Sequence, residues 1–239
     1  MSPPILSATG ITKHFGGFTA LQGVDLQVHA GERVGLIGPN GSGKSTFVNC
    51  LTGAFGIDGG VIHFQGTDIS REPAWMRSRR GISRSFQIPK PFRGLSVAEN
   101  IAVPLAFSAR IHDPAEIRAA TETVLQQVGL LHLGNASPKD LSQVELRRLE
   151  LARALAARPK LLIADEAMAG LSDSEVDEII DVLMKLNQQG IAIILIEHIM
   201  RAVLRLSQRV VVLVAGSKIA DGDPQDVMRN PEVERAYLG

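Results

Sequence analysis

The chain has little sulfur and few aromatic side chains: one cysteine, one tryptophan and one tyrosine stand among its 239 residues. A single thiol cannot close an internal disulfide, so Cys50 is expected to serve as a small buried apolar side chain. Internal repeats and low-complexity stretches are also missing. With 45% hydrophobic and 21% charged residues, the composition is that of a soluble globular protein with one large domain or two small lobes.

Net charge is absent as well, because 25 basic residues balance 25 acidic ones. This balance argues against a nucleic-acid-binding surface over the whole domain and leaves only a local basic patch open. The apolar runs at residues 191–196 and 210–215 have the length of strands and not of membrane spans. Residues 1–9 lack the basic flank and long apolar core of a secretory signal. A cytoplasmic protein is therefore expected, one that reaches a membrane only by docking to another protein.

Glycine is concentrated in one motif near the N-terminus. Residues 38–46 read G-P-N-G-S-G-K-S-T and match the P-loop pattern G-x-x-x-x-G-K-[ST]. Its glycines let the backbone N–H groups form a nest for phosphate oxygens, Lys44 can reach the β- and γ-phosphates, and the Ser45 hydroxyl can ligate Mg²⁺. The other loop residues expected to contact the phosphates are Gly38, Asn40, Gly41, Ser42, Gly43 and Thr46.

The surroundings of this motif favour phosphate binding over the alternative, a glycine-rich turn before an ordinary helix. Residues 33–37 are apolar and predict a buried strand, and residues 47–51 predict a helix. Strand, loop and helix N-terminus together form the arrangement that binds phosphate, because the helix adds the positive end of its dipole.

An α/β fold with a mostly parallel sheet is predicted by the second half of the chain. Strands at residues 161–164, 191–196 and 209–215 alternate with helices at 174–188 and 199–206. The N-terminal part predicts further strands and one helix. They are short strands joined by turns within residues 5–28, strands at 61–64 and 81–86, and a basic helix at 73–80.

Between these parts lies a region of different composition. Residues 88–94 form a proline-rich connector, and residues 96–157 have helical periodicity with breaks near Pro104, 113–114 and 135–138. Ser96 begins one helix through a capping box with Glu99. We interpret residues 88–158 as a helical lobe inserted into a core of residues 1–87 and 159–239.

Four polar residues follow apolar strands and gather where a parallel sheet binds its ligands. Asp165 would hold Mg²⁺ through a coordinated water, and Glu166 is the candidate general base. Gln87 could bridge the metal and the attacking water, and His198 could hold the γ-phosphate or steady the water. A lone polar residue after a strand is more often a loop residue. Their joint placement with the P-loop favours hydrolysis of a nucleotide.

The P-loop, Gln87, residues 161–166 and His198 occur in the order and spacing of ATP-binding-cassette ATPases, and the chain resembles this family over essentially its whole length. The resemblance implies a P-loop NTPase fold with an N-terminal antiparallel β subdomain and an inserted helical subdomain, and it implies ATP and Mg²⁺ as cofactors. It makes Asp165 and Glu166 the Walker B end, Gln87 the Q-loop and His198 the switch histidine. Phe15 becomes the aromatic that stacks on adenine, whereas residues 15–18 alone favour a side chain that plugs a sheet edge.

A closer resemblance is to the ATP-binding subunits of branched-chain amino acid transporters. It rests on six runs, namely F-G-G at 15–17, N-C-L-T-G at 49–53, R-S-F-Q at 84–87, L-I-E-H at 195–198, N-P-E-V at 230–233 and A-Y-L-G at 236–239. The resemblance implies an importer in which this subunit lies on the inner face of the cell membrane. Its partners would be transmembrane permease subunits docked on the connector and lobe, a second ATPase subunit and, indirectly, a solute-binding protein.

Two other classes stay open. One is the ATPase of a lipopolysaccharide-type or other exporter, and the other is a soluble cassette ATPase of DNA repair or translation. The second class generally carries long insertions or basic extensions, which this chain lacks. A GTPase is disfavoured because no Asn-Lys-x-Asp motif is present, and a small-molecule kinase would leave Gln87, Glu166 and His198 without a role.

One motif departs from the family. Where the family has L-S-G-G-Q, residues 141–145 read L-S-Q-V-E, so Ser142 stays while Gln143, Val144 and Glu145 replace the glycines and the glutamine. In the family this signature contacts the γ-phosphate of ATP on the opposite subunit. Val144 adds a stiff branched side chain, and Glu145 adds a carboxylate. In the next loop Ala167 stands where the family usually has Pro, and Ser172 where it has Asp or Asn.

This departure predicts functional asymmetry. Paired with a subunit that carries a regular signature, the chain would form one competent and one impaired ATP site, so a heterodimer is favoured over a homodimer. The alternative is that Ser142 and the helix dipole suffice and that both sites turn over.

Overall fold

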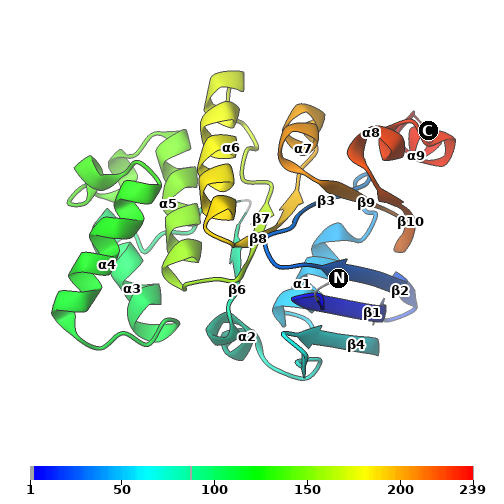
Figure 1. Cartoon of the computed structure of the whole chain (residues 1–239), viewed down its shortest axis with the longest axis horizontal. Helices are drawn as coiled ribbons and strands as arrows, with labels where there is room; N and C mark the ends of the chain where they lie inside the picture. The colour runs from blue at the N-terminus through cyan, green and yellow to red at the C-terminus, as the bar shows by residue number, and fades with distance from the viewer. Residues whose placement is uncertain (1–2, 87, 239) are drawn as a thin grey trace.

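Two β-sheets organise the chain (Figure 1). The computed structural model describes residues 3–86 and 88–238. The strands of the larger sheet are β3 (Arg33–Ile37), β6 (Ile82–Ser85), β7 (Leu161–Asp165), β8 (Ala192–Ile196), β9 (Arg209–Val214) and β10 (Ser217–Gly222). Those of the smaller sheet are β1 (Leu6–Phe15), β2 (Phe18–Val28), β4 (Gly59–Phe64) and β5 (Thr67–Asp68).

The larger sheet has the order β10-β9-β3-β8-β7-β6, and all of its pairs are parallel except β9 with β10. The smaller sheet has the order β2-β1-β4-β5 and is antiparallel throughout. The predicted α/β class, with a mostly parallel core sheet and an N-terminal antiparallel β part, is confirmed. Because parallel strands end at one edge, the segments after β3, β7 and β8 meet there.

Helices surround the larger sheet. They are α1 (Lys44–Thr52), α2 (Ala74–Arg80), α3 (Val97–Phe107), α4 (Pro114–Gln127), α5 (Gln143–Ala156), α6 (Asp173–Gln188), α7 (Met200–Leu206), α8 (Pro224–Met228) and α9 (Pro231–Leu238), with short 3₁₀ turns at Leu131–Leu133 and Pro138–Asp140. Figure 1 shows α3, α4 and α5 as a group at one end of the molecule, far from β1, β2 and β4. The exact boundaries of this lobe, at residues 88 and 158, stay a prediction.

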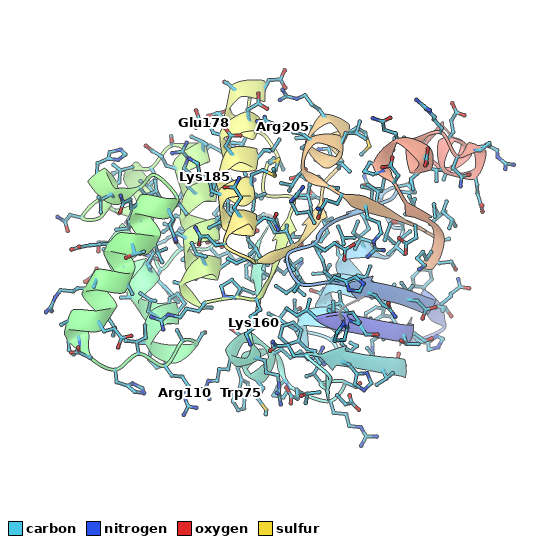
Figure 2. The ribbon with its side chains drawn as sticks, viewed as in Figure 1. Trp75, Arg110, Lys160, Glu178, Lys185 and Arg205 are labelled. Carbon is cyan, nitrogen blue, oxygen red and sulfur yellow. The ribbon has the colours of Figure 1, made fainter. Side chains whose placement is uncertain are left out.

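Two apolar cores lie on opposite faces of the larger sheet, as the alternation of side chains along a strand requires. In β7, Leu162 and Ala164 join the core formed with the lobe, α6 and α7. Leu161 and Ile163 join the core formed with α1 and the smaller sheet. A strand covered on both faces reads as a continuous apolar run, which is why this strand was recognisable in the sequence. Outside the cores, ion pairs of Arg205 with two aspartates of α6 tie α7 to that helix (Figure 2).

Three features differ from the sequence-based expectations. Residues 5–28 form two long strands, β1 and β2, and not a series of short ones. The break expected near Pro104 comes three residues later, because α3 continues through Pro104 and ends at Phe107. No helix or strand was expected after residue 215, where the structure has β10, α8 and α9. The two-residue turn before β10 has Ala215 and Gly216 at φ 47° and 80°, a hairpin geometry that Ala-Gly signals weakly.

Within residues 3–86 and 88–238, no helix combines the length and apolar character needed to cross a bilayer.

Candidate nucleotide-binding site

A cavity of about 340 Å³ lies at the N-terminus of α1. Its lining consists of residues 40–46 of the P-loop together with Phe18, Ala20 and Glu166. The structure therefore brings together the predicted phosphate-binding residues, except Gly38, and the predicted general base. They meet because β3 and β7, which precede them, are separated only by β8 in the sheet.

Two glycines fix the path of the P-loop by close approach. A Cβ on Gly38 would lie 2.1 Å from the carbonyl oxygen of Leu213, and a Cβ on Gly43 would lie 2.9 Å from that of Ala20. Their φ angles are 152° and 101°. Any side chain at either position would push the loop away from β9 or β2, and the loop would lose its fixed position.

Lys44 is folded along the loop that it belongs to. Its Nζ donates hydrogen bonds to the carbonyl oxygens of Gly38, at 2.6 Å, and Pro39, at 3.0 Å. Burial lowers the pKa of Lys44, while the carboxylates of Glu166 and Asp165 act in the opposite direction. The ammonium group belongs to a residue that lines the cavity, where a phosphate would offer it a stronger, charged acceptor.

Glu166 occupies a rare backbone conformation. Its φ is 46°, in the left-handed region that residues with a side chain seldom adopt, and its N–H donates to the carbonyl oxygen of Ile196 at 2.9 Å. Such strain is commonly retained at functional sites, where it orients a side chain. Here the turn after β7 brings the carboxylate to the cavity.

Asp165 ends β7 and is 5% exposed. Its carboxylate forms an ion pair with the guanidinium of Arg84 on β6, and the same guanidinium donates to Oδ1 of Asn49 on α1 at 2.6 Å. Arg84 was quoted in the sequence only as part of the R-S-F-Q run. Its contact with Asp165 depends on the pairing of β6 with β7 and has no local signal.

Asp165, His198 and Phe15 are predicted site residues that do not line this cavity. The side chain of His198 is 68% exposed, and its Nδ1 lies 4.0 Å from Oε2 of Glu197. Phe15 packs edge-on against Phe55 at a ring distance of 5.5 Å, and the aromatic residue that lines the cavity is Phe18. Gln87 lies outside the described residues. The roles of His198, Phe15 and Gln87 stay predictions.

Glu197 is a buried acid that the sequence analysis did not assign a role. Its Oε1 accepts a hydrogen bond from the N–H of Met168 at 2.9 Å, and its Oε2 has no hydrogen-bond partner among the described residues. Burial raises the pKa of Glu197. The carboxyl group therefore ties the end of β8 to the loop after Glu166.

The signature segment lies at the N-terminus of α5 and contributes no residue to the P-loop cavity. Ser142 caps the helix, and Oε2 of Glu145 accepts from its N–H at 2.7 Å and from its hydroxyl at 2.8 Å. This capping box was readable as S-x-x-E. Nε2 of Gln143 lies 3.5 Å from the carbonyl oxygen of Ala169, and Val144 packs at the edge of the lobe core.

Comparison with protein families identifies the class. Residues 21–169 match the family model described as ABC transporter, and residues 217–239 match that of the branched-chain amino acid ATP-binding cassette transporter. The chain therefore belongs to the ABC transporter family, as an ATP-binding cassette that hydrolyses ATP in coupling to transport.

Three relatives indicate which kind of ABC transporter cassette the chain is similar to. The high-affinity branched-chain amino acid transport ATP-binding protein BraF of Pseudomonas aeruginosa is 37% identical over 100% of this chain and 99% of its own length. LivG of Escherichia coli, which carries the same description, is 38% identical over the same shares. The probable LivG of Archaeoglobus fulgidus is 35% identical over 98% of this chain and 95% of its own.

Solved structures of ATP-binding cassettes have the same fold. A structure of MJ1267, an ATP-binding cassette of an ABC transporter, has a TM-score of 0.92 at 31% identity and covers all of both chains. Its ADP conformation has a TM-score of 0.88 at 30% identity, again over the full length of both. A dimeric post-hydrolysis state of the cassette MJ0796, bound to ADP and phosphate, has a TM-score of 0.82 at 26% identity over 92% of this chain and 98% of its own.

Proposed function

We propose that this chain is the energising subunit of a membrane importer for branched-chain or related amino acids. The observation that carries the proposal is the match of residues 217–239 to the model specific for branched-chain amino acid cassettes, because this segment lies outside the ATPase motifs. The full-length relatives named for branched-chain amino acid transport support the same substrate class.

The P-loop cavity would supply phosphate binding and a general base, two of the parts that hydrolysis of a γ-phosphate needs. The N–H groups of the loop, the N-terminus of α1 and Lys44 would hold the phosphates, and Glu166 would accept a proton from the attacking water. Exchange of the carbonyl partners of Lys44 for phosphate oxygens would position the γ-phosphate beside Glu166.

Mg²⁺ would be held by the Ser45 hydroxyl and, through a coordinated water, by Asp165. Both residues supply the hard oxygen ligands that this cation prefers, so the donor set fits. When bound, Mg²⁺ supplies positive charge against the phosphate oxygens.

A second cavity, of about 390 Å³, is proposed to receive a helix of a permease subunit. It lies between α2, α3 and α5 and is lined by exposed aromatic side chains. Exposed apolar patches of this kind often mark a binding surface for another protein. The aromatic side chains are Phe86, Phe92 and Phe107, which are 50%, 45% and 71% exposed. The groove is lined by these apolar rings together with the charged side chains of Arg84, Glu150 and Arg153, which suits an amphipathic helix of a membrane protein.

The signature supports a heterodimer. The N–H and hydroxyl of Ser142 already bind Glu145 and hold the pKa of that carboxyl below its usual range, so the group is anionic at neutral pH. A γ-phosphate brought to this helix end by a second subunit would meet a negative charge where the family offers an amide. The chain's own P-loop would instead be completed by the regular signature of a different subunit.

The experiment that tests the transport function uses the complex. The chain is purified with the membrane subunits that co-purify with it, reconstituted in liposomes, and assayed for ATP hydrolysis with the solute-binding protein of the same system. Leucine, isoleucine or valine should stimulate hydrolysis in the presence of that binding protein. Stimulation only by sugars, peptides or lipids would contradict the proposed substrate class.

A further inference from the structure

Arg84 lines the 390 Å³ groove and also binds Asp165, the neighbour in sequence of Glu166 in the P-loop cavity. On one side its guanidinium binds Asp165 of β7 and Asn49 of α1, the helix that begins in the P-loop. On the other side the guanidinium lies 5.3 Å from the ring centre of Phe86. Its side chain is 14% exposed. One rigid planar group therefore touches both a predicted ligand of the nucleotide-bound metal and an aromatic wall of the groove.

Arg84, Asn49 and Phe86 all line the 390 Å³ groove. A helix seated in the groove would press against the half-exposed ring of Phe86, and this ring covers the guanidinium. Since the guanidinium is fixed to Asp165 by a charge-assisted hydrogen bond, displacement of the ring would be passed to that carboxylate with no other side chain between them.

The same groove contains an internal comparison. Arg153 lies 5.0 Å from the ring centre of Phe92, another half-exposed aromatic of the groove. Its guanidinium binds the carbonyl oxygen of Lys90 at 2.8 Å and Oε1 of Glu150 at 2.6 Å. Both acceptors belong to the lobe or its connector. Two similar arginine–phenylalanine pairs thus line one groove. The Arg84–Phe86 pair contacts Asp165, the predicted metal ligand, whereas the Arg153–Phe92 pair contacts the lobe and its connector.

We propose that Arg84 is a positioning residue that orients Asp165 for the metal and transmits contact at Phe86 in the groove to that carboxylate. The inference rests on the proposed function, because it assumes that Asp165 serves bound Mg²⁺ and that the groove receives a membrane-subunit helix. Orientation is the expected role because a guanidinium bound to one carboxylate oxygen restricts the direction in which the other oxygen points.

The test measures ATP binding by the purified full-length chain, first in EDTA and then over a range of Mg²⁺ concentrations. In Arg84→Met, the Mg²⁺ concentration that gives half of the full change in ATP affinity should rise about 10- to 100-fold. This is the usual cost of losing a partner of a metal ligand. Affinity in EDTA should stay unchanged, which also shows that the variant is folded. Arg84→Lys keeps the charge without the planar fork and should recover part of the loss.

Substitutions of the two phenylalanines test the connection to the groove. Phe86→Ala should raise the Mg²⁺ requirement about 2- to 5-fold, as expected for loss of one cation–π contact, although Phe86 is not among the residues that line the P-loop cavity. Phe92→Ala, the matched control beside Arg153, should leave it unchanged. Equal effects of the two substitutions, or no effect of Phe86→Ala, would overturn the connection.

The outcomes separate this inference from the proposed function. If Mg²⁺ does not alter ATP binding by the unmodified chain, the proposed metal site itself is wrong. If the unmodified chain depends on Mg²⁺ but Arg84→Met has the same or a lower requirement, the metal site stands and the positioning role of Arg84 is overturned.

Discussion

Two helix N-termini carry the account, those of α1 and α5, and they differ in how their free N–H groups are satisfied. The cap of α1 is Gly43, which offers no side-chain hydrogen bond, and the first turn contains no acidic residue. The cap of α5 is Ser142, which forms a closed capping box with Glu145. One helix end presents open donors and a lysine to an anion, whereas the other already holds an anion of its own.

The comparison indicates that a single glutamate in the first turn can occupy the N–H groups of a helix end that would otherwise bind phosphate. Glu145 stabilises its helix by the same electrostatics that would otherwise attract a phosphate. The helix keeps its place in the fold while its end loses affinity for anions. Stability of the lobe and catalysis at the composite site are therefore expected to respond in opposite directions to changes at this residue.

The largest effect on ATP hydrolysis is expected at the P-loop cavity, which lies at the N-terminus of α1. In the assembled transporter, Glu166→Gln should slow hydrolysis by about 10² to 10⁴-fold, because the amide cannot accept a proton, while ATP still binds. Phosphate release and nucleotide affinity measure the two effects separately. Glu178→Gln, at a position on α6 away from the cavity, is the control and should hydrolyse ATP normally. Near-normal turnover in Glu166→Gln would remove this residue from the role of base.

A smaller effect is expected at the buried acid Glu197. Its contribution to stability depends on pH in the opposite direction to that of Glu145. The pKa of Glu197 is raised above its ordinary value of 4.5, so its contribution to stability is complete below that value and is lost as the pH rises through the raised one. Glu197→Gln does not titrate. The free energy of unfolding of this variant should therefore rise relative to the unmodified chain between pH 4 and pH 8. Urea unfolding at each pH checks this, and a difference that does not vary with pH would contradict it.

The smallest effect concerns the capping box. The lowered pKa of Glu145 means that its contribution to stability is present above the ordinary value of 4.5 and is lost as the pH falls through the lowered one. Glu145→Gln should cost about 0.3 to 1 kcal/mol at pH 7 and nothing in strong acid. Urea unfolding of the variant and the unmodified chain at both pH values measures this loss.

Glu99→Gln is a matched control, because Glu99 forms the same box with Ser96 at the start of α3. It should show the same loss of stability without any change in ATP hydrolysis. If Glu99→Gln and Glu145→Gln change the rate of ATP hydrolysis equally, the change in Glu145→Gln results from the lower stability of the lobe and not from the lost charge at the signature.

The parts of this picture that sequence could predict are those with local signals. The P-loop, the buried run of β7 and the acids after it are contiguous motifs, so their place at one sheet edge followed from the parallel topology. The Ser142–Glu145 box was equally local and was overlooked because the segment was compared with a family motif. The contact of Arg84 with Asp165 could not be predicted, since it depends on strand register and on a partner 81 residues away.

The most direct test of the central claim is ATP hydrolysis by the purified chain alone, compared with a variant carrying Q143G, V144G and E145Q. The account predicts slow turnover by the unmodified chain, because each site of a homodimer would be completed by an anionic signature. The variant should be about tenfold faster or more, since restored backbone donors can then reach the γ-phosphate. Vigorous turnover by the unmodified chain, or no gain in the variant, would contradict the claim that this signature is impaired.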